Sequence, residues 1–214
     1  MSSHVDQSPP IAGPVLGVVI AGGRSVRFGG EKAAAGLAGK PLLMWAAERL
    51  ARTCAAVAIN ARPNTEAEAL ARAEGFTVLH DRPGDATGPL AGVRVGLEWA
   101  QARGARAIAV SPCDVPLLPE NLFVRLIAAA GAGAAMAETS SGHQPLCAVW
   151  PVSALPELVA ALANGQHPPT WLMLDRMGAA RVRFSAAEMF ANINTRADLA
   201  ALAGRLERGE AQLR

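Results

Sequence analysis

The 214-residue sequence has few aromatic residues and no excess of one charge. Tyrosine is absent, and phenylalanine, tryptophan and tyrosine together make up 4% of the chain. Its 20 Lys and Arg residues face 18 Asp and Glu residues, which leaves a formal net charge of +2. No basic run alternates with aromatic residues, as a groove for single-stranded nucleic acid requires. Because the charge is balanced, we expect neither nucleic-acid binding nor membrane binding.

Cysteine is also scarce. Cys54, Cys113 and Cys147 lie far apart and show no paired spacing, which argues against a zinc site or a disulfide framework. We expect three reduced, mostly buried thiols. Cys113 is the only candidate nucleophile, but on a strand its neighbour Asp114 would point to the opposite face and would not serve it as a base. The sequence therefore argues against covalent chemistry at Cys113.

Long hydrophobic runs are missing too. No run approaches the roughly 18 apolar residues of a membrane span, and Met1–Pro10 is polar with no apolar core of the signal-peptide kind. We expect a cytoplasmic protein with a disordered tail over residues 1–13. With 51% hydrophobic residues, the chain can bury one substantial core, so residues 14–208 are predicted to form a single domain.

Strand-like and helix-like segments alternate along the first half of the chain. Strands are predicted at 15–21, 56–60, 77–79 and 107–110, and helices at 41–52, 66–74, 90–101 and 119–129. This alternation is typical of an α/β fold with a mostly parallel sheet and helices on both faces. The second half is less regular, with strands predicted at 146–150 and 180–184 and helices at 154–163, 171–177 and 196–207. The small residues of 131–142 predict a flexible connection.

A loop with four glycines and three cations follows the first predicted strand. Its members are Gly22, Gly23, Gly29, Gly30, Arg24, Arg27 and Lys32. Glycines let the backbone turn tightly and present N–H groups to anionic oxygens, while the cations neutralise charge, so the loop suits a triphosphate. Gly22 and Gly23 are adjacent, unlike the dinucleotide fingerprint, and Gly39-Lys40 is followed by Pro41 rather than by the Ser or Thr of a Walker A loop. An ordinary turn with solvated basic residues remains the alternative.

A single carboxylate, Asp114, follows the fourth predicted strand between two prolines, Pro112 and Pro116. Mg²⁺ is commonly held by one or two carboxylates together with substrate phosphates, so Asp114 suits a metal bound with a nucleotide. The alternative is that Asp114 caps the helix predicted to begin near Pro119.

The candidate site residues follow four different strands. Gly22–Lys32 follows the first, Asn60 ends the second, Asp81 follows the third and Asp114 follows the fourth. Ligands of open α/β sheets bind outside the carboxyl ends of the strands. We therefore expect these loops to converge on one edge of the sheet.

Two further segments carry weaker signals. Gly88 and Gly92 flank a Gly-Pro helix start and would let the backbone approach a base or ribose, although Gly-Pro is also common punctuation. Asn192 and Asn194 are two residues apart, so on an extended strand both amides face the same side; turn chemistry is the alternative. Thr195 and Asp198 predict a capping box at the start of the last helix.

Taken together, these segments resemble a known family. The run from Ala21 to Lys32, the Lys40-Pro41-Leu42-Leu43 segment, Pro112-Cys113-Asp114 and the Asn-x-Asn-Thr segment at 192–195 resemble nucleotidyltransferases, and most of all the molybdenum cofactor guanylyltransferases. The resemblance implies a single-domain, Rossmann-like, three-layer α/β/α fold. It also implies a nucleotide-binding half at about 14–120 and an acceptor-binding half at about 121–208.

The resemblance also implies a reaction and its site residues. GMP would pass from GTP to molybdenum-loaded molybdopterin, releasing pyrophosphate, with Mg²⁺ as cofactor and Asp114 as its ligand. Lys32, Arg24 and Asp114 are the implied catalytic residues, and Asn192 and Asn194 the implied acceptor-binding residues. The residues implied in GTP binding are Ile20, Ala21, Gly22, Gly23, Lys32, Asn60, Asp81, Gly88, Gly92 and Asp114. The implied partners are GTP, the molybdopterin cofactor and, transiently, cofactor-delivery proteins and molybdoenzyme chaperones.

The sequence departs from the family pattern at two positions. Glu31 precedes Lys32 where Asp is usual, and Arg196 follows the Asn-x-Asn-Thr segment where proline is usual. Two other functions stay open: a cytidylyl or sugar-phosphate nucleotidyltransferase, and a non-catalytic protein that binds GTP or the cofactor. Ala21-Gly22-Gly23 and Pro112-Cys113-Asp114 favour guanine over cytosine within the resemblance.

Overall fold

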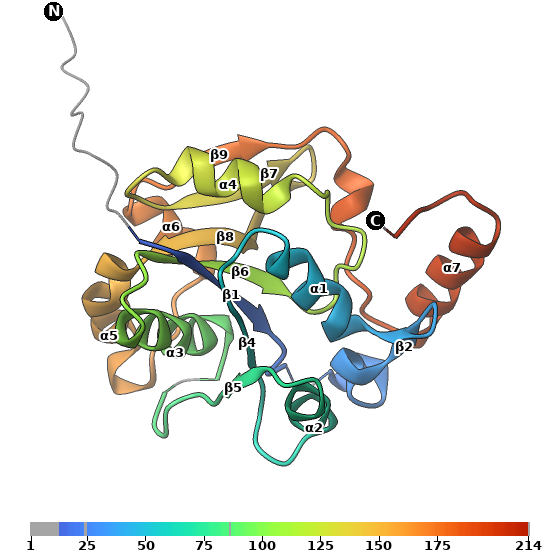
Figure 1. Cartoon of the computed structure of the whole chain (residues 1–214), viewed down its shortest axis with the longest axis horizontal. Helices are drawn as coiled ribbons and strands as arrows, with labels where there is room; N and C mark the ends of the chain where they lie inside the picture. The colour runs from blue at the N-terminus through green and yellow to red at the C-terminus, as the bar shows by residue number, and fades with distance from the viewer. Residues whose placement is uncertain (1–12, 24, 86, 214) are drawn as a thin grey trace, which may run out of the picture.

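A seven-stranded sheet forms the centre of the fold (Figure 1), which is given by a computed structural model describing residues 13–213 except Arg24 and Ala86. The strand order is β5-β4-β1-β6-β8-β7-β9. The strands are β1 (Val15–Ile20), β4 (Val57–Asn60), β5 (Thr77–Leu79), β6 (Ala107–Pro112), β7 (Ala135–Thr139), β8 (Gly142–Pro151) and β9 (Ala180–Arg183). A separate hairpin joins β2 (Gly36–Leu37) to β3 (Lys40–Pro41). The tail predicted over residues 1–13 lies, apart from Gly13, outside the described residues.

Strands β5, β4, β1 and β6 run parallel and end at the same level. Ile20 pairs with Asn60 on one side and with Pro112 on the other, and Asn60 pairs with Leu79. The loops that follow these strands therefore leave the sheet along one edge. The predicted mostly parallel sheet is confirmed, and so is its four-strand parallel core.

Beyond β6, the sheet contains antiparallel pairs of strands. Strand β8 runs antiparallel to both β6 and β7, while β9 runs parallel to β7. The flexible connection predicted over 131–142 is wrong, because this segment contains β7, an inner strand of the sheet. Ala135 and Ala137 are fully buried against the helix layer, so their small side chains serve close packing and not flexibility.

Helices cover both faces of the sheet (Figure 1). The helices on one face are α1 (Leu42–Ala51), α2 (Glu66–Ala73) and α4 (Leu122–Ala130), and those on the other are α3 (Pro89–Ala102), α5 (Leu155–Leu162) and α6 (Thr170–Arg176). Strand β1 serves both layers, since Val19 belongs to the first core and Val18 to the second. The three-layer α/β/α architecture is confirmed.

The predicted helices match the observed ones closely except at the start of α4. Pro119 is not in its first turn, because α4 begins at Leu122. The Leu122 N–H donates to the Pro119 carbonyl oxygen at 3.1 Å, which places Pro119 in the turn that precedes the helix.

Helix α7 (Arg196–Glu207) lies at the margin of the molecule, away from the sheet (Figure 1). Its Leu202 is buried with Phe28, Leu42 and Ile193 in a small separate core. Thr195 and Asp198 form the predicted capping box at its first turn. The last helix thus packs against the loop that follows β1.

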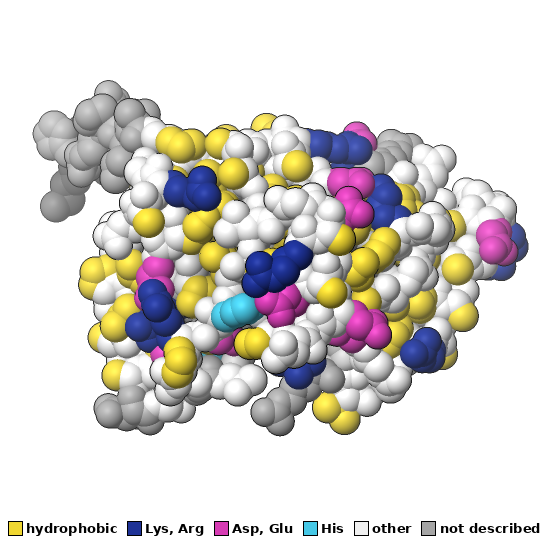
Figure 2. Space-filling model, turned by 60° about the horizontal axis from the view of Figure 1, so that its bottom comes forward, with side chains coloured by type: hydrophobic (Ala, Val, Ile, Leu, Met, Phe, Trp, Pro, Cys, Tyr) yellow, Lys and Arg dark blue, Asp and Glu magenta, His cyan; other side chains and the backbone are white. Residues whose placement is uncertain are grey.

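The surface carries charges of both signs. Figure 2 shows basic side chains beside acidic ones on the face that it draws, without a broad patch of either sign among the coloured residues. Surface ion pairs such as Arg82–Glu98 and Arg52–Glu120 follow this pattern. Within the described part of the chain, no helix is long and apolar enough to cross a membrane.

Candidate functional site

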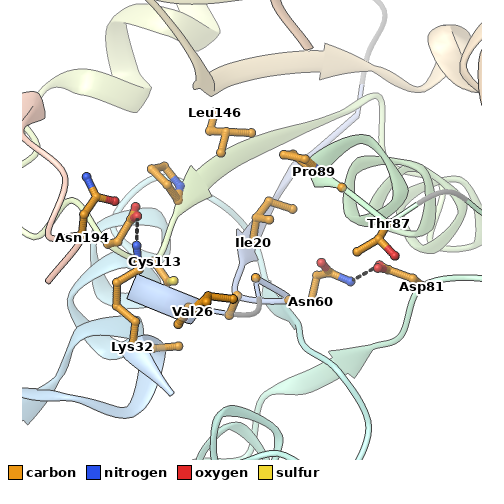
Figure 3. Close-up of a pocket in the computed structure, with 18 of the residues that line it drawn as sticks. Ile20, Val26, Lys32, Asn60, Asp81, Thr87, Pro89, Cys113, Leu146 and Asn194 are labelled. Atoms are coloured by element: carbon orange, nitrogen blue, oxygen red, sulfur yellow. Dashed lines mark hydrogen bonds and ion pairs between the residues drawn. The ribbon is translucent and has the colours of Figure 1, made fainter. Parts of the chain in front are cut away.

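A cavity of about 330 Å³ opens at the carboxyl ends of the parallel strands. The residues that line it are Ile20, Ala21, Gly22, Gly23, Ser25, Val26, Arg27, Lys32, Ala33, Asn60, Asp81, Thr87, Gly88, Pro89, Pro112, Cys113, Asp114, Leu146 and Asn194. Figure 3 shows Lys32 and Asn194 at one end of the cavity and Asn60, Asp81 and Thr87 at the other. The loops after β1, β4, β5 and β6 therefore meet here, as the sequence predicts.

Lys32 and Asp114 form an ion pair at the first end. Lys32 begins the short 3-10 helix η2 (Lys32–Ala34), and its Nζ lies 2.5 Å from Oδ2 of Asp114. The two side chains are only 14% and 16% exposed, so the pair is poorly solvated. Helix α4 has Asn121 at its N-cap, which excludes a capping role for Asp114. Asp114 is thus a partly buried carboxylate directed at a cation.

The loop between β1 and η2 turns by means of a left-handed backbone. Ser25 has φ 48° and Gly29 has φ 71°, on either side of the 3-10 helix η1 (Val26–Phe28). Phe28 is 3% exposed and anchors this turn in the core beneath α7, whereas Val26 is 83% exposed at the cavity. Arg24, expected to be catalytic, lies outside the described residues.

Asn60 and Asp81 are hydrogen-bonded to each other at the second end. Nδ2 of Asn60 donates to Oδ1 of Asp81 at 2.8 Å and to the Leu79 carbonyl oxygen at 3.2 Å. With both amide hydrogens of the 2% exposed Asn60 engaged, its orientation is fixed and it holds the Asp81 carboxylate at the cavity wall.

Gly92 lies directly beside the Asn60 amide. A Cβ at Gly92 would lie 2.3 Å from Oδ1 of Asn60 and 2.8 Å from Cδ1 of Ile20. The sequence predicts that the Gly92 backbone approaches a nucleotide, but Gly92 does not line the cavity. The missing side chain instead leaves room for the Asn60 amide.

Gly88 has a different neighbour. It lines the cavity, and a Cβ there would lie 2.2 Å from Nε2 of His167, a residue that the sequence analysis does not single out. His167 comes from the segment between α5 and α6, and no motif in the sequence relates it to Gly88.

The two asparagines near the C-terminus do not behave alike. Asn194 lines the cavity, whereas Asn192 is exposed and does not line it. The segment that contains them is not a strand, so the condition under which both amides would face the same side is not met. The Ile193 N–H donates to the Asp114 carbonyl oxygen at 2.8 Å, which ties this segment to the loop after β6. Only Asn194 is thereby brought to the cavity.

The three thiols are buried and free of disulfides, as predicted. Burial raises the pKa of Cys113 to about 12, with the nearby Asp114 charge as a smaller cause. Burial alone raises the pKa of Cys54 to about 12. Cys113 lines the cavity but is protonated at neutral pH, so it is a poor nucleophile.

The sequence agrees with a family model over most of its length. Residues 17–179 match the model described as a MobA-like NTP transferase domain. The chain belongs to the MobA-like NTP transferase family. This membership confirms the resemblance stated from the sequence, and the matched region contains Lys32, Asn60, Asp81 and Asp114.

Curated relatives in this MobA-like family share more than a third of their residues with the chain. The molybdenum cofactor guanylyltransferase of Cereibacter sphaeroides is 38% identical over 187 residues, covering 87% of this chain and 94% of the relative. The enzyme of the same name from Yersinia pestis (strain Pestoides F) is 36% identical over 187 residues, covering 86% and 92%.

Solved structures agree with the MobA-like fold. Molybdopterin-guanine dinucleotide biosynthesis protein A from Archaeoglobus fulgidus superposes with a TM-score of 0.70 at 23% identity, covering 91% of this chain and all of that one. A CMP:2-keto-3-deoxy-manno-octonic acid synthetase complexed with CTP gives a TM-score of 0.72 at 12% identity, covering 92% and 100%. At identities this low, the superpositions show a shared fold alone.

Several residues that line this cavity in the MobA-like fold were not predicted from the sequence. Leu146 reaches the cavity from β8, an antiparallel strand whose neighbours the sequence does not reveal. Thr87 and Pro89 come from the first turn of α3 and its approach. Their only signal in the sequence is adjacency to Gly88.

Proposed function

We propose that the chain transfers GMP from GTP to the terminal phosphate of molybdenum-loaded molybdopterin and releases pyrophosphate. The observation that supports this most is a single cavity with Lys32 and Asp114 at one end and the Asn60–Asp81 pair at the other. This arrangement suits a ligand with an anionic end and a hydrogen-bonding end. Relatives at 36–38% identity carry the name molybdenum cofactor guanylyltransferase.

The Asn60–Asp81 end is assigned to the guanine nucleotide. Guanine presents two neighbouring N–H donors, at N1 and at the exocyclic amine, and a carboxylate accepts from both. Asp81 is held in place by the Asn60 amide, which is itself hydrogen-bonded to the Leu79 carbonyl oxygen. A carboxylate that cannot rotate away discriminates against bases that lack paired donors.

The phosphates of GTP are assigned to the loop after β1. A Cβ at Gly23 would meet nothing within 4 Å, so a ligand can approach the backbone there, and Lys32 and Arg27 line the same cavity. When GTP binds, Lys32 would leave its ion pair with Asp114 and contact a phosphate oxygen. Lys32 would then neutralise the negative charge of the phosphate instead of that of Asp114. Arg24 is proposed to add a further cation.

The reaction is proposed to be Mg²⁺-dependent, with Asp114 as the protein ligand. Among the described residues, no three or more His, Cys, Asp or Glu side chains are grouped so that they could hold a metal ion. This part of the chain therefore offers no metal site made of protein ligands alone. A single carboxylate beside a phosphate site fits Mg²⁺, which takes its remaining oxygens from phosphates and water. Bound there, Mg²⁺ supplies charge neutralisation for the phosphate groups.

The transfer itself needs no protein base. A phosphate oxygen of the acceptor, already anionic, forms a bond to the α-phosphorus of GTP, and the bond from that phosphorus to the bridging β-phosphate oxygen breaks as pyrophosphate leaves. The work of the chain is then to align the two phosphates and to neutralise their charge. Asn194, at the Lys32 end of the cavity (Figure 3), is assigned to the acceptor side.

The test is turnover of Lys32→Ala and Asp114→Ala. Each is expected to lower pyrophosphate release by more than about a hundred-fold, the range for removing a preorganised charge from a transition state, while circular dichroism and Tm stay near those of the wild type. Lys40→Ala is the control, because Lys40 pairs with Glu48 outside the cavity. An active Asp114→Ala enzyme would contradict the assignment of the metal ligand.

A further inference from the structure

His167 connects the second half of the chain to the nucleotide end of the cavity. It lies between α5 and α6, and its Nε2 accepts a hydrogen bond from the Leu90 N–H at 3.1 Å. Leu90 is in the first turn of α3, immediately after the cavity residues Gly88 and Pro89. The contact joins residues 77 positions apart in the chain.

The first turn of α3 has no cap of its own. Its N-cap residue is Gly88, which has no side chain to accept from the free N–H groups of that turn, and Pro89 carries no N–H. The Leu90 N–H therefore finds its acceptor in His167. Because Nε2 accepts, the imidazole in this contact is neutral and carries its hydrogen on Nδ1.

Gly88 provides a second, independent sign of this contact. Its φ of 162° is extended backbone that any residue adopts, so its conformation does not require glycine. Space does: a Cβ would lie 2.2 Å from Nε2 and 2.5 Å from Cδ2 of His167. The glycine is explained by the imidazole packed against it.

The segment that carries His167 is stiffened on one side. Pro168 and Pro169 follow the histidine, which fixes their φ angles and restricts the backbone of His167 to extended conformations. Thr170, the first residue of α6, is 8% exposed and anchors the segment in the fold. The imidazole is thus presented to α3 from a rigid support.

We propose that His167 is a positioning residue for nucleotide binding. Through its contacts with Leu90 and Gly88 it holds the start of α3, where Thr87, Gly88 and Pro89 form a wall of the same cavity that Asn60 and Asp81 line. The inference rests on the proposed function, since it assigns this wall to the guanine nucleotide. It also means that the acceptor half of the chain supports the nucleotide half.

A double-mutant cycle of His167→Ala and Gly88→Ala tests the proposal. His167→Ala removes one hydrogen bond and is expected to weaken GTP binding by about five-fold, with kcat at saturating GTP within about two-fold of the wild type. Gly88→Ala alone is expected to weaken GTP binding by more than about ten-fold, because its methyl group collides with the ring. In the double variant the methyl group has room, so binding returns to the level of His167→Ala.

Two further variants separate positioning from general destabilisation. His167→Gln keeps an acceptor at similar reach and is expected to restore most of the GTP affinity. His80→Ala is the matched control, since His80 contacts Glu68 and does not line this cavity. Additive effects of the two alanine substitutions, or unchanged GTP affinity in His167→Ala, would overturn the proposal.

Amide exchange at Leu90 distinguishes this inference from the proposed function. Loss of the His167 acceptor is expected to speed hydrogen exchange of the Leu90 N–H, measured by NMR without any nucleotide. If wild-type protein fails to bind GTP, the proposed function fails, while the exchange result still decides whether His167 holds the wall. Unchanged exchange in His167→Ala would contradict the positioning role.

Discussion

At the scale of single residues, the site combines groups that are fixed before a ligand arrives. The Asn60 amide is held by two hydrogen bonds, to the Leu79 carbonyl oxygen and to Oδ1 of Asp81. Fixed polar groups lose little entropy on binding and require little reorganisation during the reaction. The Cys113 thiol, which lines the cavity, is kept neutral by burial.

Cys113→Ala is expected to keep kcat within about two-fold of the wild type, because truncating a small buried thiol removes no charge from the transition state. With the pKa of this thiol raised to about 12, its protonated form persists throughout the neutral range. The pH–rate profile of the wild type should therefore lack an inflection near the ordinary thiol pKa, as should that of the variant. Loss of turnover in Cys113→Ala would restore a covalent mechanism.

At the scale of elements, close approach of α3 to the strands sets the nucleotide end. Gly92 and Gly96 let the helix lie against β1, β4 and β6, since a Cβ at Gly96 would lie 2.9 Å from Cγ2 of Val18. A helix held this close also fixes what its first turn presents to the cavity. The close packing of α3 against the strands therefore also sets the orientation of the residues at the nucleotide end of the cavity.

Gly92→Ala is expected to destabilise the protein by about 1–3 kcal/mol, the usual cost of overpacking, and to weaken GTP binding further by displacing Asn60. Tm and calorimetric GTP affinity measure the two effects. Gly36→Ala is the control, because nothing lies within 4 Å of a Cβ at Gly36. A Gly92→Ala protein that binds GTP like the wild type would show that Asn60 does not orient the nucleotide site.

The capping box of α7 gives a prediction that depends on pH. Oδ2 of Asp198 accepts from the N–H groups of Asn194 and Thr195 at 2.9 and 2.8 Å, and these bonds lower the pKa of the carboxyl group. A carboxyl with a lowered folded-state pKa stabilises the fold above its ordinary pKa, and this contribution is lost as the pH falls through the lowered value.

Asp198→Asn is therefore expected to lower Tm at neutral pH, with the difference from the wild type shrinking as the pH falls below about 4, the ordinary range of an aspartate. Glu207→Gln, at the opposite end of α7, is the control and should not lower Tm. A Tm difference that stays constant down to acid pH would contradict the role assigned to the carboxylate.

The parallel strands and the strand segments within β8 and β9 could be predicted from the sequence, whereas β7 and the antiparallel pairing of β8 could not. The apolar run 15–21, followed by Gly22 and Gly23, indicates both a buried strand and the end at which its loop begins. Strand β7 could not be predicted, because Ala135 and Ala137 have the small side chains that are typical of a flexible linker. Only the structure shows that both are buried. The directions in which the Asn192 and Asn194 side chains lie could not be predicted either, since they depend on the contact of Ile193 with Asp114.

At the scale of the whole molecule, the two halves of the chain meet at one cavity. Asn194 and Leu146 come from the second half and complete a wall begun by the loops after β1, β4, β5 and β6. His167 makes a further contact between the halves at α3. The position of such contacts is a property of the tertiary fold, so only Asn194, which belongs to a short motif, could be anticipated from the sequence.

Pyrophosphate release with Mg²⁺ and each of GTP, ATP, CTP and UTP, with and without molybdenum-loaded molybdopterin, decides whether the chain is a guanylyltransferase. We expect release with GTP, only when the acceptor is present, in a one-to-one ratio with the guanine dinucleotide formed. Release with CTP in place of GTP, or binding of GTP without release under any condition, would contradict this expectation.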